Sequence, residues 1–163
     1  MTYPPSRRVG AVFLKAWLLC GSLDILSAIV LTCVVQHKAT VLQLLQYISS
    51  AALGPAAFTG GWYTGIAGLL LHYGIAGVFT AAYSVYAWRY PASGNTLVLH
   101  AVLYGVLVWG VMNLVVVPLS RLHAWPKWPG AFVGLLILIA LFALPMAIYL
   151  RKRLQPEPPY TRL

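Results

Sequence analysis

The chain contains four apolar runs that are each long enough to cross a lipid bilayer. They lie at residues 12–35, 61–88, 97–119 and 131–150. A hydrocarbon layer ~30 Å thick requires roughly 20 apolar residues in a helix. A span must also satisfy its backbone hydrogen bonds internally, which favours helices over open sheets. The sequence therefore predicts an all-α fold, an integral membrane four-helix bundle.

The composition leaves no room for a second, water-soluble domain. Of the 163 residues, 61% are hydrophobic and 8% are charged, whereas a soluble domain carries about 25% charged residues. Little sequence lies outside the four runs. We therefore expect a cytoplasmic N-terminal tail at residues 1–10, a single transmembrane domain at 11–154, and a cytoplasmic C-terminal tail at 155–163.

The net charge of +9 is explained by topology rather than by nucleic acid. The cations lie at the ends of the expected spans, and eight fall on one side against three on the other. The positive-inside rule then places both termini in the cytoplasm. The larger group is Arg7, Arg8, Lys15, Arg89, Arg151, Lys152, Arg153 and Arg162, and the smaller group is Lys38, Arg121 and Lys127.

Two segments near the first span need separate interpretation. The first run is longer than the 7–15 residues of a signal-peptide core and lacks a small-residue cleavage site, so we expect a membrane span. In the loop that follows, residues 40–53 repeat apolar side chains with a helical period, and Thr40 stands at the N-cap position. This pattern predicts a short amphipathic helix in the first outer loop. Its apolar stripe would face lipid or the bundle, and an Asp at Gln46 would be tolerated.

Asp24 is the candidate site residue that the sequence singles out most clearly. A carboxylate at mid-bilayer costs ~2.5–3.5 kcal/mol on insertion scales and usually faces the bundle interior. At 1.5 Å per residue, Asp24 lies about 18 Å from the cytoplasmic end of its span, and His72 and Asn113 lie about 24 Å from theirs. We therefore expect one intramembrane polar cluster of Asp24, His72 and Asn113, with Asp24 in hydrogen-bond reach of one of the others, directly or through one water.

Small residues predict where the helices approach each other closely. Gly61, Gly65 and Gly68 share one face of the second span, and Gly110 shares a face with Asn113 on the third. Small stripes are typical of helix contacts in membranes. These four glycines are the expected packing positions.

No cofactor or enzymatic chemistry is expected. His72 and His100 cannot ligate one haem, because His100 lies only about 6 Å into its span against about 24 Å for His72. Zinc ligands do not cluster locally in the sequence. No nucleophile-elbow or phosphate-loop pattern is present either. We therefore expect no metal, no cofactor and no enzyme activity.

Several stretches of the chain resemble a known group of proteins. They are LDILSA (23–28), VLQ (41–43), YISS (47–50), LGPAAFTGG (53–61), HYGIA (72–76), YG (104–105) and MNLVVVPLS (112–120). This pattern resembles small, uncharacterised four-helix proteins of the bacterial inner membrane, and more loosely the YagU-type membrane proteins linked to acid resistance. The resemblance implies a multi-pass protein of the bacterial cytoplasmic membrane, and it implies no mechanism.

Two functions are consistent with the sequence. The first is a non-enzymatic structural or accessory membrane protein that packs through its glycine faces. The alternative is a transporter or channel for protons or a small solute, using the cluster of Asp24, His72 and Asn113. The expected partner is the lipid bilayer, and a homo-oligomer or larger membrane complex stays open. A dry contact around Asp24 would favour the first, and an open cavity the second.

Overall fold

The computed structural model describes residues 6–90, 94 and 96–154. Within this part of the chain 86% of the residues are helical and none form strands. In order, the elements are α1 (Ser6–Ile29), η1 (Val30–Val35), α2 (Val41–Leu53), η2 (Gly54–Phe58), α3 (Gly61–Arg89), α4 (Leu97–Gly110), η3 (Val111–Val116), α5 (Val117–Leu119), α6 (Gly130–Leu138), η4 (Ile139–Ala143) and α7 (Leu144–Leu154). The predicted all-α fold is confirmed.

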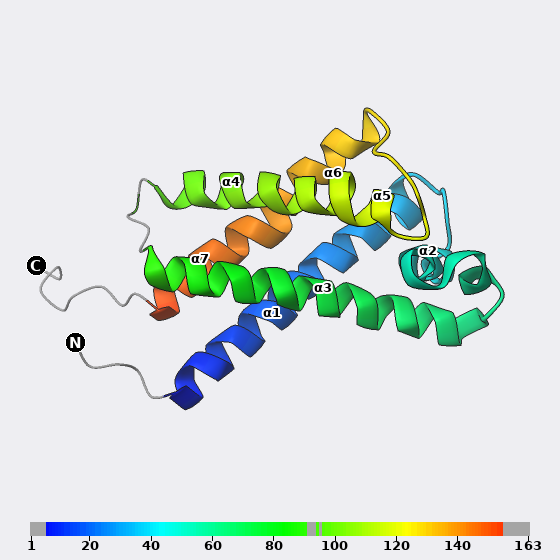
Figure 1. The fold of residues 1–163 in the computed structure, drawn as a ribbon. Helices are drawn as coiled ribbons and strands as arrows, with labels where there is room; N and C mark the ends of the chain where they lie inside the picture. The colour runs from blue at the N-terminus through cyan, green and yellow to red at the C-terminus, as the bar shows by residue number, and fades with distance from the viewer. Residues whose placement is uncertain (1–5, 91–93, 95, 155–163) are drawn as a thin grey trace, which may run out of the picture.

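Three of the long helices contain a π-helical segment. The segment η1 extends α1, η3 lies between α4 and α5, and η4 joins α6 to α7. Together with their flanking α-helices they form continuous rods (Figure 1). Because α1 begins at Ser6, residues 6–10 of the expected tail are helical. Residues 1–5 and the expected tail at 155–163 lie outside the described residues.

Neighbouring rods run in opposite directions. Trp17 near the start of α1 donates a 2.7 Å hydrogen bond to the carbonyl of Tyr73 in the middle of α3. Tyr104 of α4 donates a 2.6 Å bond to the carbonyl of Phe79. The start of α1, the end of α3, the start of α4 and the end of α7 consequently meet at one end of the bundle (Figure 1), which we call the terminal end.

The best-packed core lies toward the terminal end. Small residues of α1, α3 and α4 surround larger side chains such as Tyr83 and Met146, which are 2% and 0% exposed. The cluster comprises Ala16, Cys20, Ala76, Tyr83, Ala87, Leu97, Ala101, Phe142, Met146, Ala147 and Leu150. The opposite half of the bundle is packed more openly, and the candidate site lies there.

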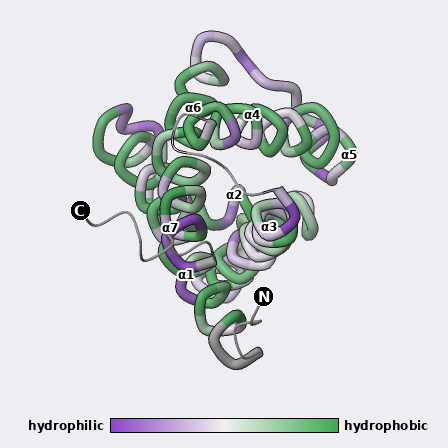
Figure 2. The backbone as a smooth tube through the Cα atoms, turned by 90° about the vertical axis from the view of Figure 1, so that its left-hand side faces the viewer, coloured by the Kyte–Doolittle hydropathy of each residue, from purple (hydrophilic) through white to green (hydrophobic). Residues whose placement is uncertain are grey.

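The outer surface of the bundle is apolar. Leu70 and Val78 of α3 are each 68% exposed, and Leu103 of α4 is 58% exposed. Figure 2 shows apolar residues on all the helices of the bundle. In the described part of the chain, five helices are long and apolar enough to cross a membrane: the four expected spans and the 18-residue segment Val41–Phe58. Soluble proteins rarely expose so large an apolar area to water. This surface is that of a multi-pass membrane protein.

The helix α2 lies across the other rods. It is seen nearly end-on in Figure 1, at the end of the bundle where α1 finishes and α3 begins. Its start follows the sequence closely. Thr40 Oγ1 accepts a hydrogen bond from the backbone N–H of Gln43, and the Gln43 side chain accepts one from the N–H of Thr40. This capping box satisfies backbone donors that a helix start otherwise leaves free.

The buried face of α2 carries polar residues as well as Leu45 of the expected apolar stripe. Its buried residues are Leu45, Gln46, Ser49 and Ser50, while apolar residues such as Tyr47 are exposed. Gln46 Nε2 donates to the carbonyl of Gly61 at 3.1 Å, so the polar face is held against α3. The Gln46 side chain is 5% exposed, so the structure predicts that Asp is not tolerated there.

Candidate functional site

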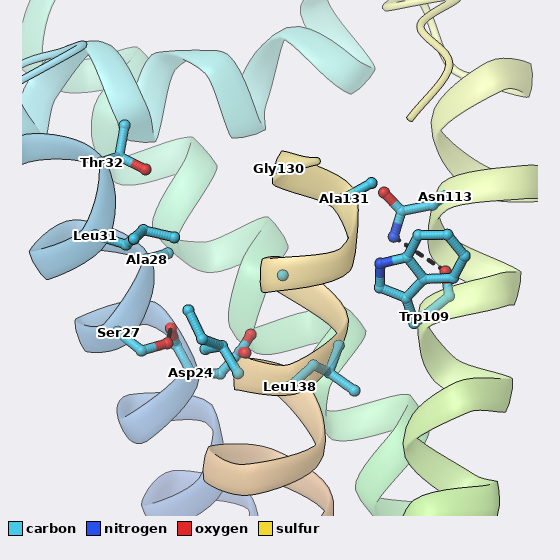
Figure 3. A pocket seen from close by; sticks show the side chains of 12 residues that line it. Asp24, Ser27, Ala28, Leu31, Thr32, Trp109, Asn113, Gly130, Ala131 and Leu138 are labelled. Atoms are coloured by element: carbon cyan, nitrogen blue, oxygen red, sulfur yellow. Dashed lines mark hydrogen bonds between the residues drawn. The ribbon is translucent and has the colours of Figure 1, made fainter. Parts of the chain in front are cut away.

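A cavity of about 260 Å³ opens in the loosely packed half of the bundle, and Asp24 lines it. Its walls come from α1 and η1 on one side, from α4 and η3 on another, and from α6 between Gly130 and Leu138. Figure 3 shows the Asp24 carboxylate pointing into the space between α1 and α6. The cavity is large enough for several water molecules or a small ligand.

The polar groups in this cavity include one carboxylate and no cationic side chain. Asp24 supplies a carboxylate, and Asn113 supplies its amide oxygen because its Nδ2 donates to the carbonyl of Trp109 at 3.0 Å. Thr32 and Ser27 add hydroxyl groups, the second donating to the Asp24 backbone carbonyl at 2.6 Å. No Lys, Arg or His is among the lining residues. The cavity therefore favours a ligand that is cationic or donates hydrogen bonds.

The Asp24 carboxylate itself accepts no hydrogen bond from any residue that the structure describes. The expected direct bond between Asp24 and either His72 or Asn113 is not present. Asp24 and Asn113 share one cavity, so the structure brings two members of the expected cluster around one space without joining them.

His72 has a different role from the expected one. Its Nε2 lies 3.0 Å from the carbonyl oxygen of Gly21, one turn before Asp24 on α1, and its ring packs edge-on against Tyr73 with the centroids 5.5 Å apart. His72 is not among the residues that line the cavity. It joins α3 to α1, because a partly buried imidazole in an apolar layer needs a hydrogen-bond partner.

Two of the four predicted packing glycines lie in close helix contacts. A Cβ at Gly68 would collide with the backbone of α2 at Leu45, and one at Gly65 would lie 2.8 Å from the Leu42 side chain. Gly61 and Gly110 do not lie in close helix contacts as expected, since a Cβ at either position would meet nothing within 4 Å. Gly61 instead has a φ of +56°, which favours glycine at the start of α3.

Sequence reasoning missed the contact between α4 and η4. A Cβ at Gly105 would lie 2.6 Å from the Ile139 side chain and 3.2 Å from the Ile139 Cα. Ala101 and Gly105 are four residues apart, which is the spacing of small residues at close helix contacts. That spacing of small residues could have predicted the contact between α4 and η4.

The π-helical segments surround the cavity, and no sequence signal indicated them. Leu31 and Thr32 belong to η1, Asn113 belongs to η3, and η4 begins directly after Leu138. Short π segments are rare and occur often at functional sites, because the widened turn changes the direction of its side chains. Among the described residues, no group of three His, Cys, Asp or Glu side chains is placed to hold a metal ion.

These features define the class of protein. The chain is an all-helical, multi-pass membrane protein with a polar cavity among its helices. It matches no protein-family model, no curated protein and no solved structure. Its function must therefore be argued from the cavity and the topology alone.

Proposed function

We propose that this chain is a four-span protein of the bacterial cytoplasmic membrane, and that the Asp24 cavity serves as its intramembrane site for a proton or a small solute. The non-enzymatic character expected from the sequence is part of this proposal. The observation that carries it is the Asp24 carboxylate, which lines an open cavity and accepts no hydrogen bond from the described residues.

The direction of the helices supports four spans rather than five. Were α2 a fifth span, α1 and α3 would run parallel, because one crossing would lie between them. They run antiparallel, and α2 lies across their ends (Figure 1). The segment is then a helix at the outer surface, with Tyr47 and Leu53, 47% and 41% exposed, toward lipid. The cation asymmetry orients the terminal end toward the cytoplasm.

The cavity supports a solute or proton site more than a purely structural role for Asp24. A structural carboxylate at this depth is stabilised by hydrogen bonds, because the unpaired group is costly. Here Ser27 donates to a backbone carbonyl of its own helix, and Asn113 donates to the Trp109 carbonyl, so neither bond is directed at the carboxylate. The carboxylate is left free to accept a proton or a ligand.

The second candidate is the structural or accessory role. It is favoured by His72, which joins α1 to α3, and by the glycines of α3 that hold α2. Under this reading the polar residues stabilise packing only. The resemblance to uncharacterised inner-membrane proteins is compatible with both candidates.

Proton flux into liposomes separates the two. Purified protein is reconstituted with a trapped pH-sensitive dye, a pH gradient is applied, and the rate of dye response is measured. We expect flux above that of protein-free liposomes, and we expect Asp24→Asn to remove it while the variant stays folded. Glu157→Gln, which removes the chain's other acidic side chain, is the matched control and should retain flux. Flux that Asp24→Asn leaves unchanged would contradict a proton site at this residue.

A further inference from the structure

A second hollow lies directly beside the Asp24 cavity. It is a groove of about 390 Å³ between α1 with η1 and the α6–η4 helix. Apart from Ser27, the residues that line it are apolar. Leu26 and Val30 on its wall are 55% and 51% exposed, and Val35 at one end is 64% exposed. The groove therefore opens on the outer, lipid-facing surface of the bundle.

The groove and the Asp24 cavity share part of their walls. Ser27 and Leu31 on the α1 side and Ile137 on the α6 side line both. On α1, Asp24 and Ala28 face the cavity, while Leu23 and Leu26 face the groove, so the two hollows lie on adjacent faces of one helix. Leu31 and Ile137 therefore lie at the boundary between the Asp24 cavity and the apolar groove.

We propose that the cavity and the groove together bind an amphiphilic ammonium cation, with its charged head beside Asp24 and its alkyl chain in the groove. The proposal rests on the proposed function, since it requires that a ligand reach Asp24. The charge of the head follows from the lining, which offers one carboxylate and no cationic side chain. The indole of Trp109, also on the cavity wall, adds an aromatic face of the kind that quaternary ammonium groups favour.

The apolar part of the ligand follows from the groove. A small hydrophilic cation would leave this surface to the lipid tails, whereas an attached alkyl chain covers it while remaining at the same depth as the head group. Entry from the bilayer needs no aqueous path for the chain, because Leu26 and Val30 are exposed to lipid. The apolar contacts of the alkyl chain with the groove and the pairing of the ammonium head with Asp24 then stabilise the same bound ligand.

Protection of Asp24 from a carboxyl reagent tests this inference. Dicyclohexylcarbodiimide, which enters membranes and modifies carboxyl groups, is added to the full chain in liposomes, and modification at Asp24 is measured by peptide mass spectrometry. Decyltrimethylammonium at about ten times its dissociation constant should slow the modification about tenfold. Tetramethylammonium, which has the head alone, and decyl sulfate, which has the opposite charge, should not protect.

Variants test the groove separately. Leu141→Trp places a large side chain in the groove at a residue that does not line the cavity, and it should abolish protection by decyltrimethylammonium while Asp24 stays reactive. Leu18→Trp is the matched control, since Leu18 is 46% exposed on α1 and lines neither hollow. It should leave protection unchanged.

The outcomes separate this inference from the proposed function. Modification of Asp24 without protection by the decyl cation would overturn the inference and leave an accessible Asp24. Equal protection by decyl sulfate would overturn it in favour of any lipid chain in the groove. A dimer in solution that Val30→Trp dissociates would assign the groove to a second copy. Absence of modification at Asp24, with Glu157 modified in the same sample, would overturn both proposals.

Discussion

The contact between α2 and α3 can be tested with a single methyl group at Gly68. A Cβ at this position would collide with the Leu45 carbonyl oxygen, and it would lie 2.9 Å from the Leu45 carbonyl carbon and 3.1 Å from the Ser49 nitrogen. These are backbone atoms, which cannot rotate away. Since carbon atoms prefer separations of ~3.5–4.0 Å, α2 would have to shift by about 0.6 Å or more. Overpacking of this kind costs ~1–3 kcal/mol.

The matched control for Gly68→Ala is Gly74→Ala on the same helix, where a Cβ would meet nothing within 4 Å. Both changes gain the same helix propensity, ~0.8–1.0 kcal/mol. That gain cancels when the two variants are compared, so the difference in their free energies of unfolding measures the contact alone. Gly65→Ala should fall between them, because its close neighbour is the tip of the Leu42 side chain, which can rotate.

Thermal unfolding in detergent, followed by circular dichroism, measures the effect. With roughly 2–4 °C per kcal/mol for a chain of this size, Gly68→Ala should unfold about 2–12 °C below Gly74→Ala. A Gly68→Ala protein that is as stable as Gly74→Ala would refute the close approach of α2 to α3. It would also remove the basis for placing the polar face of α2 inward.

Three other predictions follow from single contacts and from topology. Gln46→Asp should lower the unfolding temperature, because it replaces a buried hydrogen-bond donor with a charge. Gln43→Asp should be tolerated, because Gln43 is exposed and an acidic side chain is favourable in the first turn of a helix. Trp17→Phe should cost about 0.5–1.5 kcal/mol in chemical unfolding, since it removes the 2.7 Å bond to the α3 backbone; an unchanged stability would argue against that contact. Reporter fusions after Trp88 and after Leu150 should both report the cytoplasm, and a periplasmic signal from either would contradict the four-span topology.

Local signals in the sequence were sufficient for the helices themselves. The spans predicted at residues 61–88 and 97–119 agree closely with α3 and with the rod from Leu97 to Leu119, because the length of an apolar run is a local property. Thr40 likewise identified the start of α2, since an N-cap depends only on its near neighbours in the sequence. The sequence alone also identified Asp24 as a candidate site residue, because it is a carboxylate in an otherwise apolar run.

The rotation of each helix about its axis was decided only by the tertiary structure. Lipid-facing and buried side chains are both apolar in a membrane bundle, so hydrophobic periodicity does not tell which face of a helix meets its neighbours. The sequence pattern therefore did not predict that Gln46 of α2 faces α3. It also did not predict that His72 bonds to a carbonyl of α1 rather than to Asp24. The cavity lies between helices that are far apart in the sequence, since residues as distant as Asp24 and Leu138 line it.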